Sequence, residues 1–364
     1  MLITFLLSFI KYMTNKKKKN PANQFYNLFG KIHTNHQQLL QLLAIIYEPV
    51  SVTKLYKCIN QLDIKDSNDK KYTQKKLKQT LEELQTRGIL ESFNKNFFVT
   101  SPLPEKLCRL ALAEGIFHNM ADTARKEFPL RQGWDYTYFT SAKQCFSDIR
   151  MAIYNNDTEK ADNLINHYAE VYQYEYQQQD PAYTICFQPF DAEWFSRFSP
   201  DMMSLAIQSA FRENSCNFAV VDELMPWLLN SFQSKTIIQA EQLAFMCAGQ
   251  FLLHGDLASA NTICLFTDDY HRLLLSGWQQ FIQGENDLAI ESFETAIAMY
   301  KKMTRKRKVF INNLSGVFFI LALIKSKDPQ RLQQALDYSK LHRKQKQHSN
   351  PASHQVLAHL HTTR

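Results

Sequence analysis

The chain has 364 residues, of which 45% are hydrophobic and 21% charged, and it contains only 9 glycines and 11 prolines. These values exclude a largely disordered protein, and the length suffices for two or three domains of roughly 100 to 200 residues each. The net charge of +7 is unevenly distributed, because residues 111–300 carry 10 basic and 25 acidic groups, whereas residues 301–364 carry 14 basic and 2 acidic ones. This asymmetry is typical of a chain whose basic ends bind nucleic acid or an acidic partner. The alternative is that the charged residues only face solvent.

Residues 1–30 are predicted to be a disordered, basic N-terminal segment. Its apolar run "MLITFLLSFI" has about half the roughly 20 residues that a membrane-spanning helix needs. The lysines follow this run instead of preceding it, and no small-residue cleavage site is present, which argues against a secretory signal. Translation from Met13 would leave a polar tail. We therefore expect a cytoplasmic protein without membrane contact.

Residues 31–105 predict three short helices followed by a β-hairpin. Apolar residues recur at helical spacing in "NHQQLLQLLAIIYEP", after Ser51 and again after Thr73. Ser51 and Thr73 are suitable N-caps, and Gly88 can take the left-handed conformation that ends the third helix. The segments "ILESF" and "FFVT", separated by "NKN", predict the two strands.

This order of elements resembles the winged-helix family, in which the third helix can face the major groove of DNA. The resemblance implies phosphate contacts by lysines, an adenine contact by a glutamine and a backbone contact at the wing tip. The candidates for these contacts are Lys75, Lys76, Lys78, Gln79 and Lys95. Glu82 and Glu83 lie on or beside the same face and oppose phosphate contact. Because winged helices also dock on proteins, double-stranded DNA and a second protein both remain open as partners.

Residues 106–345 predict a series of helices without sustained strand alternation. The segment "LLLSGWQQFIQGENDLAIESFETAIAMYKK" resembles a tetratricopeptide repeat, a pair of antiparallel helices packed through small residues. The positions that match the packing motif are Gly277, Gly284, Ala289, Phe293 and Ala296. The match is partial, since Leu273 stands where the family has tryptophan and Lys301 where it has proline.

Related spacings occur elsewhere in this region. Gly255 and Ala260 repeat the five-residue offset of Gly284 and Ala289, and Asn156 with Ala161 repeats it more weakly. The first two turns lie 29 residues apart, fewer than the usual number of about 34, so the repeats are irregular. The sequence therefore predicts a mainly α protein: a winged helix followed by an irregular α-solenoid of helix pairs. The concave face of such a solenoid typically binds a protein partner.

The chain ends in two further basic segments. "KKMTRKRK" has six basic residues in eight, and no acid occurs between Lys301 and Lys327. This run predicts a site for an acidic partner or for nucleic acid, with a solvated run as the alternative. The candidate residues are Arg305, Lys306, Arg307 and Lys308. Residues 346–364 predict a flexible basic tail whose histidines lack a complete ligand set for a metal.

The sequence lacks the common motifs of nucleotide-binding enzymes, metalloproteases and serine hydrolases. The seven cysteines include no C-x-x-C pair, which favours buried thiols in a reducing compartment over disulfides or a zinc site. There is no G-x-x-x-x-G-K-[ST] phosphate loop, no H-E-x-x-H and no G-x-S-x-G. We therefore expect no catalytic residues, no metal site, no cofactor and no small-molecule substrate.

A second resemblance concerns the segment "LLAIIYEPVSVTKLYKCINQL" and the elements that follow it. It is similar to the amino-terminal accessory region of bacterial Swi/Snf-type helicases, in which an ATP-driven DNA motor follows. This chain has neither the phosphate loop nor the D-E-x-H box of that motor. Two functions are thus predicted: a non-enzymatic interaction protein, or an accessory region or truncated relative of a DNA-dependent ATPase.

Overall fold

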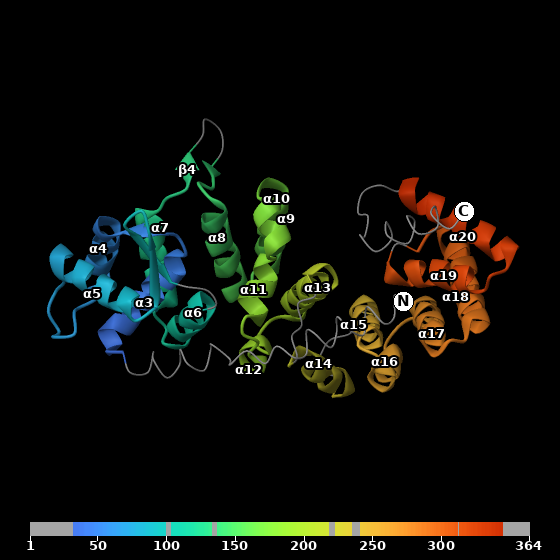
Figure 1. Cartoon of the computed structure of the whole chain (residues 1–364). Helices are drawn as coiled ribbons and strands as arrows, with labels where there is room; N and C mark the ends of the chain where they lie inside the picture. The colour runs from blue at the N-terminus through green and yellow to red at the C-terminus, as the bar shows by residue number, and fades with distance from the viewer. Residues whose placement is uncertain are drawn as a thin grey trace. The chain divides into compact units, whose positions relative to one another are not determined.

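A computed structural model of the chain describes residues 32–99, 103–132, 137–217, 223–234, 241–311 and 313–344. Within these ranges the fold is mainly helical, with one three-stranded and one two-stranded sheet (Figure 1). The chain divides into two compact units, Met1–Ser209 and Ala210–Arg364, and each is described by itself. The predicted segments 1–30 and 346–364 lie outside the described residues.

The first unit begins with two helices separated by a very short strand, then a third helix and a hairpin. These elements are α3 (Thr34–Ile46), β1 (Val50–Ser51), α4 (Val52–Gln61), α5 (Gln74–Thr86), β2 (Leu90–Phe93) and β3 (Asn96–Val99). Ser51 Oγ accepts a hydrogen bond from the Lys54 amide, and Thr73 Oγ1 accepts one from the Lys76 amide, so both predicted N-caps are confirmed. Gly88, just after α5, has a φ of +73°, which confirms the predicted left-handed turn.

The three strands form one antiparallel sheet with β3 in the middle. Val50 of β1 pairs with Phe97, and Leu90 of β2 pairs with Val99. The hairpin turn consists of Asn94 and Lys95, whose φ angles of +50° and +64° suit a tight two-residue connection. The hairpin was predicted, whereas β1 was not, because a strand of two residues shows no alternation.

Helix α3 is central to the first unit. It packs against β3 and against α6 (Leu103–Ala113), α7 (Phe117–Glu127) and α8 (Ala142–Tyr154). Burial of apolar side chains on α3, α4 and α5 supplies the main stabilisation of this part of the fold. The most deeply buried of these side chains are Leu39, Leu40, Leu42, Leu43, Leu55, Ile59, Leu77 and Leu81. The predicted domain boundary after residue 105 falls within α6 and stays a prediction.

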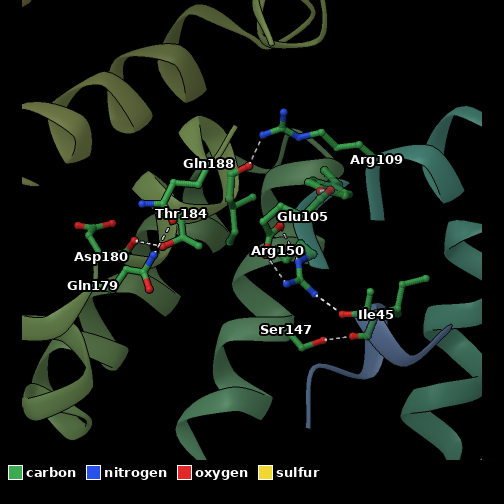
Figure 2. A network of polar contacts seen from close by, with 12 residues as sticks. Ile45, Glu105, Arg109, Ser147, Arg150, Gln179, Asp180, Thr184 and Gln188 are labelled. Carbon is green, nitrogen blue, oxygen red and sulfur yellow. Dashed lines mark hydrogen bonds and ion pairs between the residues drawn. The ribbon is translucent and has the colours of Figure 1, made fainter. Parts of the chain in front are cut away.

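A buried ion pair fixes α3, α6 and α8 to one another (Figure 2). The guanidinium of Arg150 on α8 donates to both carboxylate oxygens of Glu105 on α6, at 3.0 and 2.5 Å. Its third nitrogen donates to the carbonyl oxygen of Ala44 at 3.1 Å, and Ser147 Oγ donates to that of Ile45. Two carbonyls near the end of α3, which have no partner within the helix, are thereby satisfied. The ring of Tyr47 lies 4.7 Å from the guanidinium.

The remainder of the described first unit consists of a two-stranded sheet and further helices, of which α9 and α11 pack against α8. The elements are β4 (Arg131–Gln132), β5 (Thr137–Tyr138), α9 (Thr158–Val171), α10 (Gln173–Gln178), α11 (Pro181–Phe187), α12 (Ala192–Phe195) and the start of α13 (Pro200–Asn217). Arg109 of α6 donates to the carbonyls of Ile185 and Pro189, and its guanidinium lies 4.1 Å from the centre of the Trp194 ring. One side chain thus joins α6 to the segment around α11 and α12.

In its described residues, the second unit contains the end of α13 and seven further helices. These are α14 (Leu224–Gln233), α15 (Glu241–Leu253), α16 (Leu257–Cys264), α17 (Asp269–Gln283), α18 (Asn286–Thr304), α19 (Leu314–Lys325) and α20 (Pro329–Lys344). Consecutive helices pack as pairs: α15 with α16, α17 with α18, and α19 with α20. Helix α17 also packs against α15 and α19, so each pair contacts the next.

The same turn geometry recurs between paired helices. Gly255 and Gly284 have φ angles of +76° and +88°, and Asn156 between α8 and α9 has +57°. At each turn the next amide donates to a carbonyl five residues earlier, as from Asp256 to Phe251 and from Glu285 to Gln280. The three positions that the sequence analysis aligned therefore share one local structure.

Candidate functional site

The predicted DNA-binding residues of α5 lie on the solvent side of that helix. Lys75, Lys78 and Gln79 are exposed and Lys76 is half-buried, while Leu77 faces the core. The first turn contains no acidic residue. The N-terminal half of α5 is therefore a basic surface, and the partial positive charge of a helix N-terminus adds to it.

The acidic residues of α5 lie towards its other end. Glu82 and Glu83 are both exposed, and the Glu82 carboxylate lies 3.7 Å from the Lys78 ammonium. Both side chains of this pair are more than half exposed, so the pair contributes little stability, about 0.2 to 1 kcal/mol. Lys78 can therefore exchange Glu82 for a phosphate with little loss of free energy.

The β2–β3 hairpin presents the remaining predicted DNA contact. Lys95 is exposed at the turn, and Phe93 before it leaves 66% of its surface in solvent. Gln85 of α5 donates a hydrogen bond to Ser92 Oγ at 3.0 Å, which ties the hairpin to the C-terminal end of α5. The exposed phenylalanine was not singled out in the sequence analysis, although its place beside the predicted turn was visible there.

The predicted packing residues of the segment 273–302 meet between α17 and α18. Ala289, Phe293 and Ala296 are fully buried on α18. Gly277 of α17 lies against the Phe293 ring, where an added Cβ would come within 3.0 Å of three ring carbons. Gly284 forms the turn. The structure thus brings all five residues of this set to one helix pair.

The predicted basic candidates 305–308 follow α18 and are all exposed. Helix α18 ends at Thr304, and Arg305 takes a left-handed conformation with a φ of +55°. Within the described part of the chain, no ion pair links these four residues or the neighbouring Lys301 to an acidic group. Their charge is therefore directed to solvent.

Part of this basic run borders a cleft of about 350 Å³ between α18, α19 and α20. Three cations, Lys301, Arg307 and Lys308, line it, whereas the other candidates Arg305 and Lys306 do not. The apolar lining is supplied by Ile297, Ala298, Val309, Phe319 and Tyr338, and the polar remainder by Glu294 and Gln334. Sequence reasoning identified the charge but missed the cleft, because α20 lies more than 20 residues further along the chain.

The walls of this cleft are fixed by hydrogen bonds. The Ile311 amide donates to the Tyr338 hydroxyl at 2.8 Å, and Gln334 donates to the Glu294 carboxylate at 2.8 Å. Burial raises the pKa of Tyr338 well above its usual value, so the phenol stays neutral. Ile311 also lies so close to Gly316 that any side chain there would overlap its carbonyl oxygen.

The first unit has a cleft that the sequence did not predict. It has about 200 Å³ of space and lies between α3, α7 and α8. Arg125 and Asp148 form an ion pair in its lining, and Glu48 accepts a hydrogen bond from Ser141 beside it. Arg125 and Asp148 are the two charged groups of this lining that pair with each other, and we assign the cleft no ligand.

The six cysteines whose side chains the structure describes are unsuited to nucleophilic catalysis. Among those described, Cys58, Cys108, Cys145, Cys186 and Cys247 are buried and Cys264 is half-buried. Burial raises the pKa of Cys58 to about 11 and that of Cys145 to about 12. At neutral pH these thiols are protonated, whereas a nucleophilic cysteine requires the thiolate.

The described ranges contain no group of three His, Cys, Asp or Glu side chains arranged to hold a metal ion. None of the helices described is both long enough and apolar enough to cross a membrane. Comparisons with protein-family models, with curated proteins and with solved structures found no match to the chain.

Proposed function

We propose that the chain is a non-enzymatic adaptor. Its N-terminal part docks on duplex DNA as a winged helix, and its helix pairs form an irregular solenoid that binds a protein partner. The observation that carries the proposal is the basic, solvent-exposed N-terminal half of α5, which packs its other face on the core.

The order of elements supports the winged-helix assignment. Helix, strand, two helices and a hairpin follow one another, and the strands pair in the order β1-β3-β2. In this family the third helix reads the major groove, a role that falls to α5. The exposed positions Lys75, Lys78 and Gln79 lie early on that helix, where they would reach phosphates and a base edge.

The hairpin would add a second contact to DNA. Lys95 at its turn is suited to a phosphate, and the neighbouring exposed Phe93 can pack against sugar or base edges. The pair Lys78–Glu82 opposes this use only weakly, because both charges are exposed and their interaction is small. Basic charge therefore dominates the surface that would face the duplex.

The second unit supports the protein-binding half of the proposal. Pairs of helices that contact only their neighbours are the building principle of solenoids, whose extended surfaces bind peptides and proteins. Adjacent pairs in this unit pack in that way, and two of them share the turn at Gly255 and Gly284.

The DNA contact is tested with a triple variant, Lys75→Glu, Lys76→Glu, Lys78→Glu, in the full-length protein. We expect the wild type to bind a labelled duplex with an affinity that falls steeply with salt, since each neutralised phosphate contributes about 0.9 to the logarithmic slope. The triple variant should lose this binding.

The matched control changes three exposed lysines outside the proposed surface, Lys126, Lys160 and Lys325, to glutamate. It makes the same change in net charge and should keep most of the affinity. Equal losses in both variants, or a salt-independent affinity of the wild type, would assign α5 to protein docking instead.

A further inference from the structure

The cleft between α18, α19 and α20 combines unpaired positive charge with an apolar floor. Lys301, Arg307 and Lys308 stand at its rim, and none of the three has an acidic partner among the described residues. Ile297, Val309 and Phe319 also line the cleft and are buried. The acidic groups of α18 nearest to α20 are already engaged, Asp287 by Arg331 and Glu294 by Gln334.

We propose that this cleft binds an acidic peptide segment of a partner protein, with carboxylates at the Lys301 and Arg307 side and an apolar side chain on the floor. The inference rests on the proposed function and names the chemistry of the partner. Its basis is charge complementarity. Three cations that have no acidic partner among the described residues line a space of about 350 Å³, near the lower end of the range for ligand pockets.

The cleft is preformed, which reduces the entropic cost of binding. The segment that carries Arg307 and Lys308 continues into Val309, Phe310 and Ile311, and all three of these are buried. The hydrogen bond from Ile311 to Tyr338 attaches this segment to α20. The two cations therefore extend from a fixed segment of backbone.

The lining favours a peptide over nucleic acid. Bases bind single-stranded sites by stacking on exposed aromatic faces. Here the Phe319 and Tyr338 rings pack against each other edge to face, with centroids 5.0 Å apart, and both are buried.

The test measures fluorescence anisotropy of the full-length protein with a synthetic peptide, Asp-Glu-Asp-Leu-Phe-Glu-Asp-Asp, and with its Asn/Gln counterpart. We expect binding of the acidic peptide only. The variant Lys301→Glu, Arg307→Glu should weaken it by about tenfold or more, which corresponds to about 1.4 kcal/mol.

The matched control is Lys302→Glu, Lys306→Glu, which changes two neighbouring cations of the same run that do not line the cleft. It should change the affinity little. The variant Ala298→Trp fills the cleft without changing charge, and since Ala298 is exposed, it should block binding while thermal unfolding stays as in the wild type.

Equal weakening by both charge variants would show a diffuse electrostatic attraction and overturn the proposal. Equal binding of the neutral peptide, or no binding of the acidic one, would overturn it as well. If a labelled oligonucleotide binds the wild type, and Lys301→Glu, Arg307→Glu abolishes that binding whereas Lys302→Glu, Lys306→Glu does not, the site binds nucleic acid and the peptide proposal is wrong. The DNA contact of α5 is measured with different variants, so the failure of either hypothesis is distinguishable from that of the other.

Discussion

At the scale of single residues, Arg150 joins three helices through contacts that the sequence did not predict. It is fully buried, forms two hydrogen bonds with Glu105 and one with the Ala44 carbonyl, and lies beside the Tyr47 ring. A buried charge pair of this kind is costly to break, because removal of one partner leaves the other uncompensated.

We therefore expect Arg150→Met to lower the free energy of unfolding by about 3 to 5 kcal/mol. Chemical denaturation of the full-length chain measures this loss. The double variant Arg150→Met, Glu105→Leu removes both charges and should recover much of it. If the double variant loses as much as the single one or more, the ion pair does not couple these helices.

At the scale of elements, the helix pair α17–α18 depends on small side chains at its contact. Ala289 is fully buried there, whereas Ala298 on the same helix is exposed. The two positions differ in environment within one element, so they form a matched comparison.

Ala289→Trp should lower stability by about 1 to 3 kcal/mol or more, because the added ring overpacks the helix contact. Ala298→Ser should stay within about 0.5 kcal/mol of the wild type. Thermal unfolding distinguishes them. A melting temperature of Ala289→Trp equal to that of the wild type would remove the packing role assigned to this position.

Local features of the elements were predictable from the sequence. The caps at Ser51 and Thr73, the turn at Gly88 and the hairpin around Lys95 each depend on residues within a few positions of one another. Features that join distant segments were not predictable. The contact of Arg150 with Glu105 spans 45 residues, and the cleft beside Arg307 needs Tyr338 of α20. Neither pairing leaves a periodic signal in the sequence.

At the scale of the whole molecule, we expect the chain neither to bind ATP productively nor to hydrolyse it, with or without DNA. Phosphoryl transfer needs a backbone cradle and a lysine for the phosphates, together with carboxylates for magnesium. The run Lys301–Lys308 supplies charge without that arrangement.

The measurement is phosphate release by the purified protein in the presence of duplex DNA. The variant Lys306→Glu, Arg307→Glu serves as the control for the charge of the basic run. Two carboxylates near the helix pairs have structural roles, since Asp256 caps α16 and Asp287 pairs with Arg331. Turnover that persists through purification and disappears when Asp256 or Asp287 is replaced would contradict the adaptor proposal.

The recurring turn between paired helices has a consequence for how such a chain can change in length. Each turn is closed by hydrogen bonds within a few residues, as at Gly255 and Gly284, and each pair packs on its neighbours. Gain or loss of one whole pair therefore leaves the geometry of the other turns intact. The span of the second unit can be adjusted in steps of about one helix pair, while the unit that contains α5 stays the same.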